Sequence, residues 1–288
     1  MRPDWYPESL FPYESNFLDV GDARVHYIDE GKGPVLLMLH GNPTWSFLYR
    51  HIIAELRNSF RCIALDYPGF GLSKAHGSHY DYRPASHAEV VHQFIVRLDL
   101  QDITFVMQDW GGPIGLSVAA RNHDRIRAFV IGNTWAWPLN GDRHFETFSK
   151  TTSGVFGRFA IRNANAFVNV AIPAGTVRKL SHAEMKAYRG PFPDRASRRP
   201  TEVFPRELLE SRDLLYDLER ELPKMSKTPT LFVWGEQDLA FRNKELRRFR
   251  LAFPNSEMVM LPDAGHYIQE DAPAEISRAI SDFLAKPT

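Results

Sequence analysis

The segment Ile103-Thr104-Phe105-Val106-Met107-Gln108-Asp109-Trp110-Gly111-Gly112-Pro113-Ile114-Gly115 decides the fold of this chain. Its first five residues have the β-branched and apolar character of a buried strand, and an apolar helical pattern follows the glycines. An acidic residue therefore occupies a tight turn where a helix packs close to a strand. This is the shape of a nucleophile elbow in which Asp109 stands at the position of the usual serine. Asp109 could instead simply cap the helix that follows it.

Further apolar runs of strand length alternate with helical patterns, which is typical of an α/β protein with a mostly parallel central sheet and helices on both faces. A capping box, Ser86-His87-Ala88-Glu89, predicts the start of one helix, and a second helix is predicted after Asp271. The predicted strands are 35–39, 61–65, 103–107, 128–131, 230–233 and 257–261, preceded by a hairpin over 16–30 that turns at Gly21-Asp22.

The strand patterns stop between Trp137 and Lys227, where helical patterns, aromatic residues and basic residues take over. A second capping box, Ser181-His182-Ala183-Glu184, lies in this part of the chain. The β/α alternation resumes at Pro229, so the helical part is an insertion between two strands of one sheet. We therefore predict a core domain formed by residues 1–136 and 228–288 and a helical cap domain formed by residues 137–227.

Composition restricts the class of protein. The 288 residues include 35 Lys and Arg, 35 Asp and Glu, and 43% hydrophobic residues, as in a soluble globular protein. A net charge of zero lacks the basic excess that binding to nucleic acid requires. The single cysteine, Cys62, cannot form an internal disulfide and lies in an apolar run, so we expect it to be buried. No secretory signal or membrane-span pattern is present, which predicts a cytoplasmic protein without a membrane partner.

A carboxylate nucleophile restricts the reaction. Attack of Asp109 on an ester or amide would form a labile anhydride, whereas attack on a saturated carbon that carries a leaving group forms a stable alkyl ester. Water must then attack the carbonyl carbon of this ester, which requires a general base and an oxyanion hole. The sequence is therefore expected to supply both.

His266 follows the last predicted strand and is the expected base, because it comes late in the chain, in the order nucleophile, acid, histidine. The acid that orients it should follow the preceding strand, where we choose Asp238. Glu236 and Asp263 are the alternatives. An acid could also follow strand 128–131, but Asn133 at that position cannot serve as a carboxylate.

The backbone NH groups of Asn42 and Trp110 are the expected oxyanion donors. Their side chains add an amide NH2 and an indole NH beside Asp109, and a departing halide needs such donors but no proton. Asn42 could instead be a turn former and Trp110 a core aromatic residue. Asp66 also follows a strand, and we interpret it as a turn residue. No phosphate-binding glycine loop or metal-spaced cluster of His or Cys is present, so we predict neither a cofactor nor a metal.

Four motifs of this chain belong together: His40-Gly41-Asn42-Pro43-Thr44-Trp45-Ser46, Gln108-Asp109-Trp110-Gly111-Gly112-Pro113, Ala187-Tyr188-Arg189-Gly190-Pro191-Phe192 and Gly265-His266-Tyr267-Ile268-Gln269-Glu270-Asp271. They resemble the haloalkane dehalogenases of the α/β-hydrolase fold, and the resemblance covers nearly the whole chain. The resemblance implies that Asp109 displaces halide from a haloalkane, that His266 activates water, that Asp238 is the acid, and that Asn42 and Trp110 clamp the halide. It implies no cofactor.

The resemblance also implies an apolar substrate pocket lined by Phe148, Phe167 and Pro205. Asp238 together with Asn42 matches a branch of the family whose members are often oligomeric, which favours a homo-oligomer.

Two other functions are open. Epoxide hydrolases share the Asp nucleophile, the Trp after it and the later acid, but they need a proton donor that two cap tyrosines supply. Tyr188 and Tyr216 are the tyrosines of the insertion, and Asn42 favours a halide, since epoxide hydrolases more often have an aromatic residue there. The third hypothesis is a non-catalytic binding protein of the hydrolase fold. The presence of every expected catalytic side chain argues against it.

Overall fold

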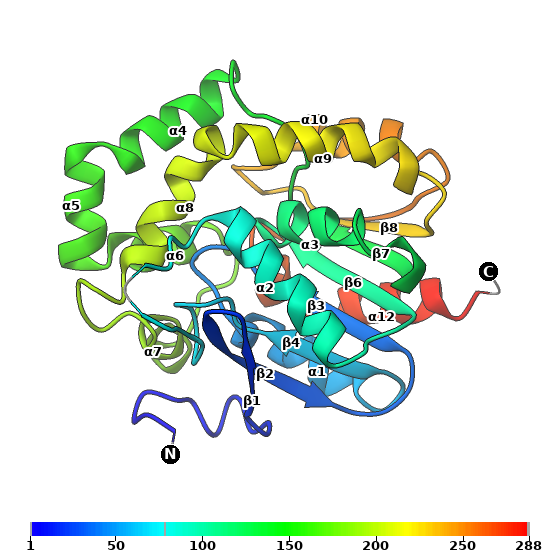
Figure 1. Ribbon diagram of the computed structural model, residues 1–288, viewed down its shortest axis with the longest axis horizontal. Coiled ribbons are helices and arrows are strands. Elements are labelled where there is room, and N and C mark those ends of the chain that lie inside the picture. Colours follow the sequence, from blue (N-terminus) through cyan, green and yellow to red (C-terminus); the bar gives the residue numbers. More distant parts are fainter. Residues whose placement is uncertain (1, 78, 287–288) are drawn as a thin grey trace.

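The strands form one sheet in the order β1-β2-β4-β3-β6-β7-β8-β9, and β5 pairs with β2 outside this path. The computed structural model describes residues 2–77 and 79–286 (Figure 1). β2 pairs antiparallel with β1 and β4, and every pairing from β4 to β9 is parallel. The strands are β1 (Asn16–Val20), β2 (Ala23–Glu30), β3 (Val35–Leu39), β4 (Arg61–Leu65), β5 (Lys74–Ala75), β6 (Ile103–Gln108), β7 (Ile126–Gly132), β8 (Thr230–Gly235) and β9 (Glu257–Leu261).

The central strands are buried because helices cover both faces of the sheet. α1 packs against α12 on one face, while α2, α3 and α9 pack together on the other (Figure 1). The helices are α1 (Arg50–Leu56), α2 (Pro84–Arg97), α3 (Gly111–Ala119), α4 (Arg143–Ser153), α5 (Val155–Ala164), α6 (Ile172–Ala174), α7 (His182–Arg189), α8 (Arg199–Glu210), α9 (Arg212–Met225), α10 (Asn243–Ala252), α11 (Ile268–Asp271) and α12 (Pro273–Leu284).

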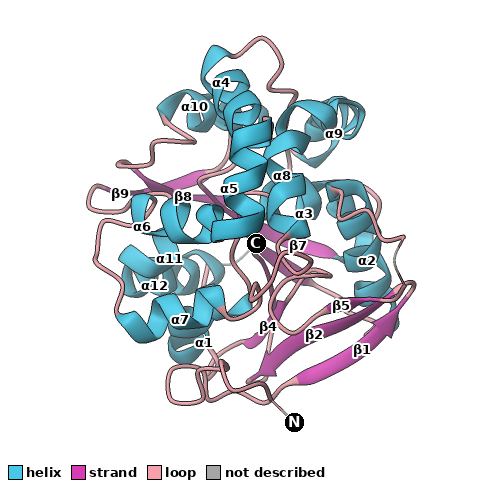
Figure 2. Ribbon diagram, turned by 90° about the vertical axis from the view of Figure 1, so that its left-hand side faces the viewer, coloured by secondary structure: helices cyan, strands magenta, loops and turns pink. Residues whose placement is uncertain are grey.

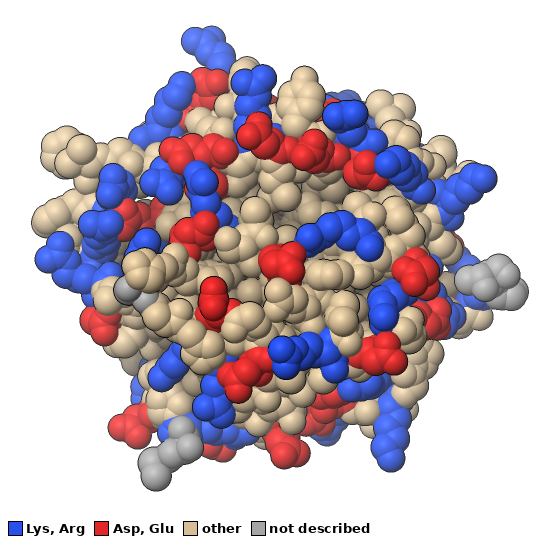
Figure 3. All heavy atoms as spheres, in the orientation of Figure 1, with Lys and Arg blue, Asp and Glu red and all other residues tan. Residues whose placement is uncertain are grey.

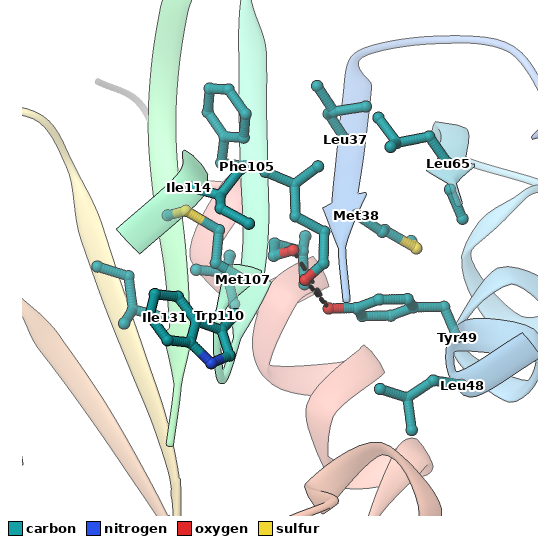
Figure 4. Packing of buried hydrophobic residues seen from close by; sticks show 14 of the residues in the cluster. Leu37, Met38, Leu48, Tyr49, Leu65, Phe105, Met107, Trp110, Ile114 and Ile131 are labelled. Carbon is teal, nitrogen blue, oxygen red and sulfur yellow. Dashed lines mark hydrogen bonds between the residues drawn. The ribbon is translucent and has the colours of Figure 1, made fainter. Parts of the chain in front are cut away.

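The core under the elbow is built from buried side chains of β3, β6 and α3. Leu37 on β3, Phe105 and Met107 on β6, and Ile114 on α3 pack together (Figure 4). Tyr49 is also fully buried, and its hydroxyl donates a hydrogen bond to the Leu39 carbonyl at the end of β3 (2.8 Å). This packing fixes the carboxyl ends of β3 and β6 relative to one another, which is where ligands bind in open α/β sheets.

Between β7 and β8 the described chain forms helices α4 to α9 and no strand. Five of them, α4 to α8, project to the left of the sheet in Figure 1, and α5 faces the viewer in Figure 2. The capping box at Ser181 and Glu184 is confirmed at the start of α7. None of the helices in residues 2–77 and 79–286 has the length and hydropathy of a membrane span.

The capping box predicted at Ser86 to Glu89 is wrong. α2 begins at Pro84, so Ser86 lies inside the helix, and Glu89 accepts a hydrogen bond from Gln93 instead. Proline at the first helical position has a pre-set φ and no NH to satisfy, and this starts the helix earlier than the box predicts.

Candidate active site

The turn after β6 has the predicted elbow geometry. Asp109 adopts a left-handed backbone conformation with φ +51°, which costs energy for a residue with a side chain. Its carbonyl accepts a hydrogen bond from the Thr134 hydroxyl (2.5 Å), which helps to hold this conformation. α3 begins at Gly111, where a Cβ atom would lie 2.1 Å from the Leu39 carbonyl oxygen, so the turn can approach β3 only because no side chain is present.

The loop after β3 supplies a backbone donor to the Asp109 carboxylate. The Asn42 NH donates to Oδ1 of Asp109 over 2.8 Å. A Cβ on Gly41 would lie 2.0 Å from the same oxygen, so this approach also needs glycine.

His40 holds this loop in place. Burial lowers the pKa of His40 to about 4, so its ring is neutral and can both donate and accept. Nδ1 lies 2.8 Å from the Gly41 carbonyl oxygen, and Nε2 accepts a hydrogen bond from the Tyr67 NH (3.1 Å). A histidine of the sequence motif is thereby placed in a supporting position rather than beside the carboxylate.

His266 lies between two carboxylates. Its Nδ1 is 2.9 Å from Oδ2 of Asp238, and its Nε2 is 3.5 Å from Oδ2 of Asp109. Asp238 is buried, whereas Glu236 and Asp263 are exposed, so the geometry favours Asp238 among the three candidate acids. Burial alone would lower the pKa of His266, but the negative charges of Asp238 and Asp109 outweigh burial and raise it to about 10.

Two further residues contact Asp238 and His266. Neither of them was assigned a role in the site from the sequence. Asn133 donates through Nδ2 to Oδ2 of Asp238 (2.9 Å), and its Oδ1 accepts from the Gly235 NH (2.7 Å). Gln108 donates through Nε2 to the backbone carbonyl of His266 (3.0 Å), and the same nitrogen is 3.1 Å from the imidazole Nε2. Both residues lie at the carboxyl end of a parallel strand, β6 or β7. Because ligands bind at these strand ends, this position could have identified them from the sequence.

A cavity of about 240 Å³ opens above Asp109. Its walls are mainly apolar, and Phe148, Phe167 and Pro205 all contribute, as do Phe145, Leu208, Leu239, Phe241 and Tyr267. Asn42 and Trp110 also line it, and no described residue accepts a hydrogen bond from Nδ2 of Asn42 or from the Trp110 indole. Of the tyrosines of the insertion, Tyr188 is buried away from the cavity against Glu270, and Tyr216 is half exposed on α9.

A buried ion-pair cluster lies behind the His266 loop. Arg50 on α1 binds both carboxylate oxygens of Glu270 (2.6 and 2.8 Å) and one of Glu184 on α7 (2.8 Å). Arg178 also pairs with both of these glutamates. His51, Glu184 and Glu270 are close enough to hold a metal ion, but the two arginines already neutralise the carboxylates. The cluster therefore ties α7 of the insertion to the segment that carries His266.

The predicted turn role of Asp66 agrees with its contacts. Its carboxylate accepts hydrogen bonds from the backbone NH groups of Ser46 (2.7 Å) and Leu72 (2.9 Å) and lies 2.7 Å from Nδ1 of His26. Both carboxylate oxygens accept hydrogen bonds inside the fold and Asp66 is fully buried, so its carboxylate does not face a substrate.

Comparison with known proteins gives the following similarities. Residues 34–273 match the α/β hydrolase fold family. Haloalkane dehalogenase 2 of Mycobacterium tuberculosis is 46% identical over 97% of this chain and 98% of the relative. A cis-3-alkyl-4-alkyloxetan-2-one decarboxylase of Shewanella oneidensis is 35% identical over 97% of this chain and 91% of the relative. The crystal structure of the haloalkane dehalogenase DbeA from Bradyrhizobium elkani superimposes with a TM-score of 0.86 at 29% identity, covering 94% of this chain and 97% of that one.

Proposed function

The chain belongs to the haloalkane dehalogenases of the α/β-hydrolase fold, and from this premise we propose that its site hydrolyses carbon–halogen bonds, giving an alcohol, a halide ion and a proton. The observation that carries the proposal is the placement of the Asp109 carboxylate. One oxygen accepts the Asn42 NH at 2.8 Å, and the other lies 3.5 Å from an imidazole that Asp238 orients.

In the proposed first step, Oδ2 of Asp109 attacks the carbon that bears the halogen. The new carbon–oxygen bond forms as the carbon–halogen bond breaks, and the halide leaves with the bonding electrons. The side chains of Asn42 and Trp110 are proposed to bind the halide, because both line the cavity and neither donates to another described residue. The apolar walls remove water from the carboxylate, which strengthens the electrostatic interactions inside the cavity.

Formation of the ester neutralises Asp109 and so removes one of the two charges that raise the pKa of His266. His266 then loses its proton to solvent, which accounts for the proton released in the overall reaction. The neutral imidazole next takes a proton from water as the water oxygen attacks Cγ of the ester. Negative charge develops on Oδ1, where the Asn42 NH already donates, and collapse of the intermediate restores the carboxylate and releases the alcohol.

Halide release tests this proposal. Purified protein is incubated with 1-bromobutane and 1,2-dibromoethane, and bromide and alcohol are both measured. We expect equal amounts of the two products, and near-background release from Asp109→Asn. The matched control is Asp263→Asn, an exposed aspartate in the loop before His266, which should retain parental activity. Parental activity in Asp109→Asn would contradict the proposal.

We also propose that residues 137–227 act as a cap domain over the core formed by residues 1–136 and 228–288. This is supported by the cavity wall, to which α4, α8 and the π-helical segment Phe167–Ala171 contribute. A homo-oligomer and a cytoplasmic location remain predictions from the sequence.

A second candidate reaction is favoured by the 35% identity to an oxetanone decarboxylase. An oxetan-2-one also contains a saturated carbon that carries a leaving group, namely the ring oxygen. Attack by Asp109 there would open the ring to a carboxylate, and loss of carbon dioxide with departure of Asp109 would form an alkene. No water is consumed, so His266 would not be needed as a base.

The two reactions are separated by supplying a dialkyl oxetan-2-one to the parent and to His266→Ala. Alkene formation at similar rates by both proteins would support the second candidate. If the parent forms no alkene, the decarboxylation reaction is excluded, whatever the result with bromides.

Epoxide opening is disfavoured because neither Tyr188 nor Tyr216 reaches the cavity. An epoxide is therefore run beside the bromides, and we expect no diol.

A further inference from the structure

The inserted helices carry a marked excess of positive charge. Residues 146–202 contain ten Lys and Arg but only four Asp and Glu (Glu146, Glu184, Asp194 and Glu202), although the whole chain is neutral with 35 of each. The rest of the chain is correspondingly acidic. The protein therefore has a positive end, located on the segment that covers the cavity, and such a charge asymmetry directs the molecule towards anionic partners.

The same segment exposes large apolar side chains. Val155, Phe156 and Phe159 on α5 are 82%, 89% and 66% exposed, and Val170 is 63% exposed. α5 lies at one end of the long axis of the molecule, and at that left-hand edge in Figure 3 tan groups protrude beside a cluster of Lys and Arg. Contiguous exposed apolar side chains usually mark a contact surface.

Arginines stand beside these apolar side chains. Arg158 and Arg162 share the single carboxylate of Glu202, so the pair keeps a net positive charge. Arg195 lines the same groove, of about 310 Å³, together with Val155, Arg158, Phe159, Arg162 and Asn163. Within the described part of the chain, Arg195 forms no ion pair with a carboxylate.

We propose that α5 and this groove form a docking site for an anionic phospholipid bilayer. Phe156 and Phe159 would enter the boundary between headgroups and acyl chains, and Arg158, Arg162 and Arg195 would bind lipid phosphates. Helices that lie in a membrane interface combine aromatic side chains with Arg or Lys in this way. The predicted absence of a membrane partner rested on the lack of a spanning segment, and a surface contact does not need one.

Two observations favour a bilayer over a protein partner. α5 runs along the left-hand edge of the molecule in Figure 1 and faces the viewer in Figure 2, so its length is exposed as a helix lying in a membrane interface requires. The docking face also adjoins the cavity. Phe148 on the neighbouring helix α4 is 40% exposed, lines the cavity and packs on Phe167 with ring centroids 6.3 Å apart. Apolar molecules dissolved in a bilayer would thus meet the cavity wall directly.

The experiment is flotation of the full chain with vesicles. One set is phosphatidylcholine alone, and the other contains about one third phosphatidylglycerol. We expect binding to the anionic vesicles, weakened by high salt, and little binding to neutral ones. The double variant Phe156→Ser/Phe159→Ser should bind at least about tenfold more weakly, and Arg195→Gln about fivefold more weakly.

Matched controls come from α10, which carries similar exposed side chains on another part of the surface. Leu251→Ser removes an 85% exposed apolar side chain, and Arg250→Gln removes a charge, and both should bind vesicles as the parent does. Thermal unfolding and halide release should be unchanged in all of these variants, since none of the altered residues lines the cavity.

Absence of binding to anionic vesicles would overturn the proposal, as would parental binding by the double phenylalanine variant. Sedimentation velocity tests the alternative that a second copy of the chain binds the α5 face. If the parent self-associates without binding vesicles and the double variant is monomeric, the α5 face is an interface between copies of the chain and the lipid proposal is wrong.

Discussion

The charge of Asp109 is predicted to hold the proton on His266 in the free enzyme. Asp109→Asn removes that charge while keeping nearly the same shape, and it therefore imitates the electrostatics of the ester intermediate. Nε2 of His266 lies 3.5 Å from Oδ2 of Asp109, and two unit charges at this distance, with an effective dielectric constant of about 20, interact by about 5 kcal/mol. This energy corresponds to about 3.5 powers of ten in proton affinity. The pKa of His266, about 10 in the parent, should therefore fall towards neutrality in the variant.

The assay is an NMR titration of protein with isotopically labelled histidine. The chain has 11 histidines, and the His266 signal is identified by its loss in His266→Gln. Asp263→Asn is the control and should leave the titration unchanged. If His266 titrates at the same pH in the parent and in Asp109→Asn, then the carboxylate does not hold the proton. Ester formation on Asp109 would then not free His266 to act as a base.

Three further predictions concern the stability of the fold and the loop after β3 that contains Gly41 and Asn42. The pKa of His266 in the folded protein is raised above its ordinary value of 6.5, so its contribution to stability is fully present below about pH 6.5 and is lost as the pH rises through about 10. Urea unfolding should show a loss of up to about 5 kcal/mol over this range, and a smaller loss in Asp109→Asn; equal losses would contradict this. Gly41→Ala should lower kcat by about 100-fold or more with the fold retained in circular dichroism, because the added Cβ would lie 2.0 Å from Oδ1 of Asp109; unchanged kcat would show that the loop can shift at no cost. Glu270→Gln should lower the free energy of unfolding by about 3–5 kcal/mol, since it leaves the buried Arg50 poorly compensated; a change below about 1 kcal/mol would show that Glu184 alone suffices.

Much of the sheet could be predicted because its strands are short apolar runs with clear ends. The predicted bounds of β3, β4 and β9 match the structure, and the hairpin of β1 and β2 turns at Gly21 as expected. β5, with only Lys74 and Ala75, is too short to carry any pattern. The start of α2 was misplaced because two local signals competed, and the proline at Pro84 prevailed over the capping box.

The candidate site could be predicted from the sequence where a residue type is unusual for its position in a motif, as Asp109 is in the elbow. The choice among Glu236, Asp238 and Asp263 depends on which side chain turns inward from a loop, and periodicity does not encode this. Burial of Asp238 and its contact with His266 separate the three in the structure. The contact of Gln108 with the histidine was hidden for a similar reason, since it joins residues 158 positions apart in the sequence.

The central claim is that Asp109 becomes alkylated and that His266 is needed to hydrolyse the ester. The most direct measurement is mass spectrometry of His266→Ala after incubation with 1-bromobutane. We expect one equivalent of bromide and a mass increase of one butyl group on the peptide that contains Asp109. Sustained turnover by this variant, or a butyl group on another residue such as Asp66, would contradict the account.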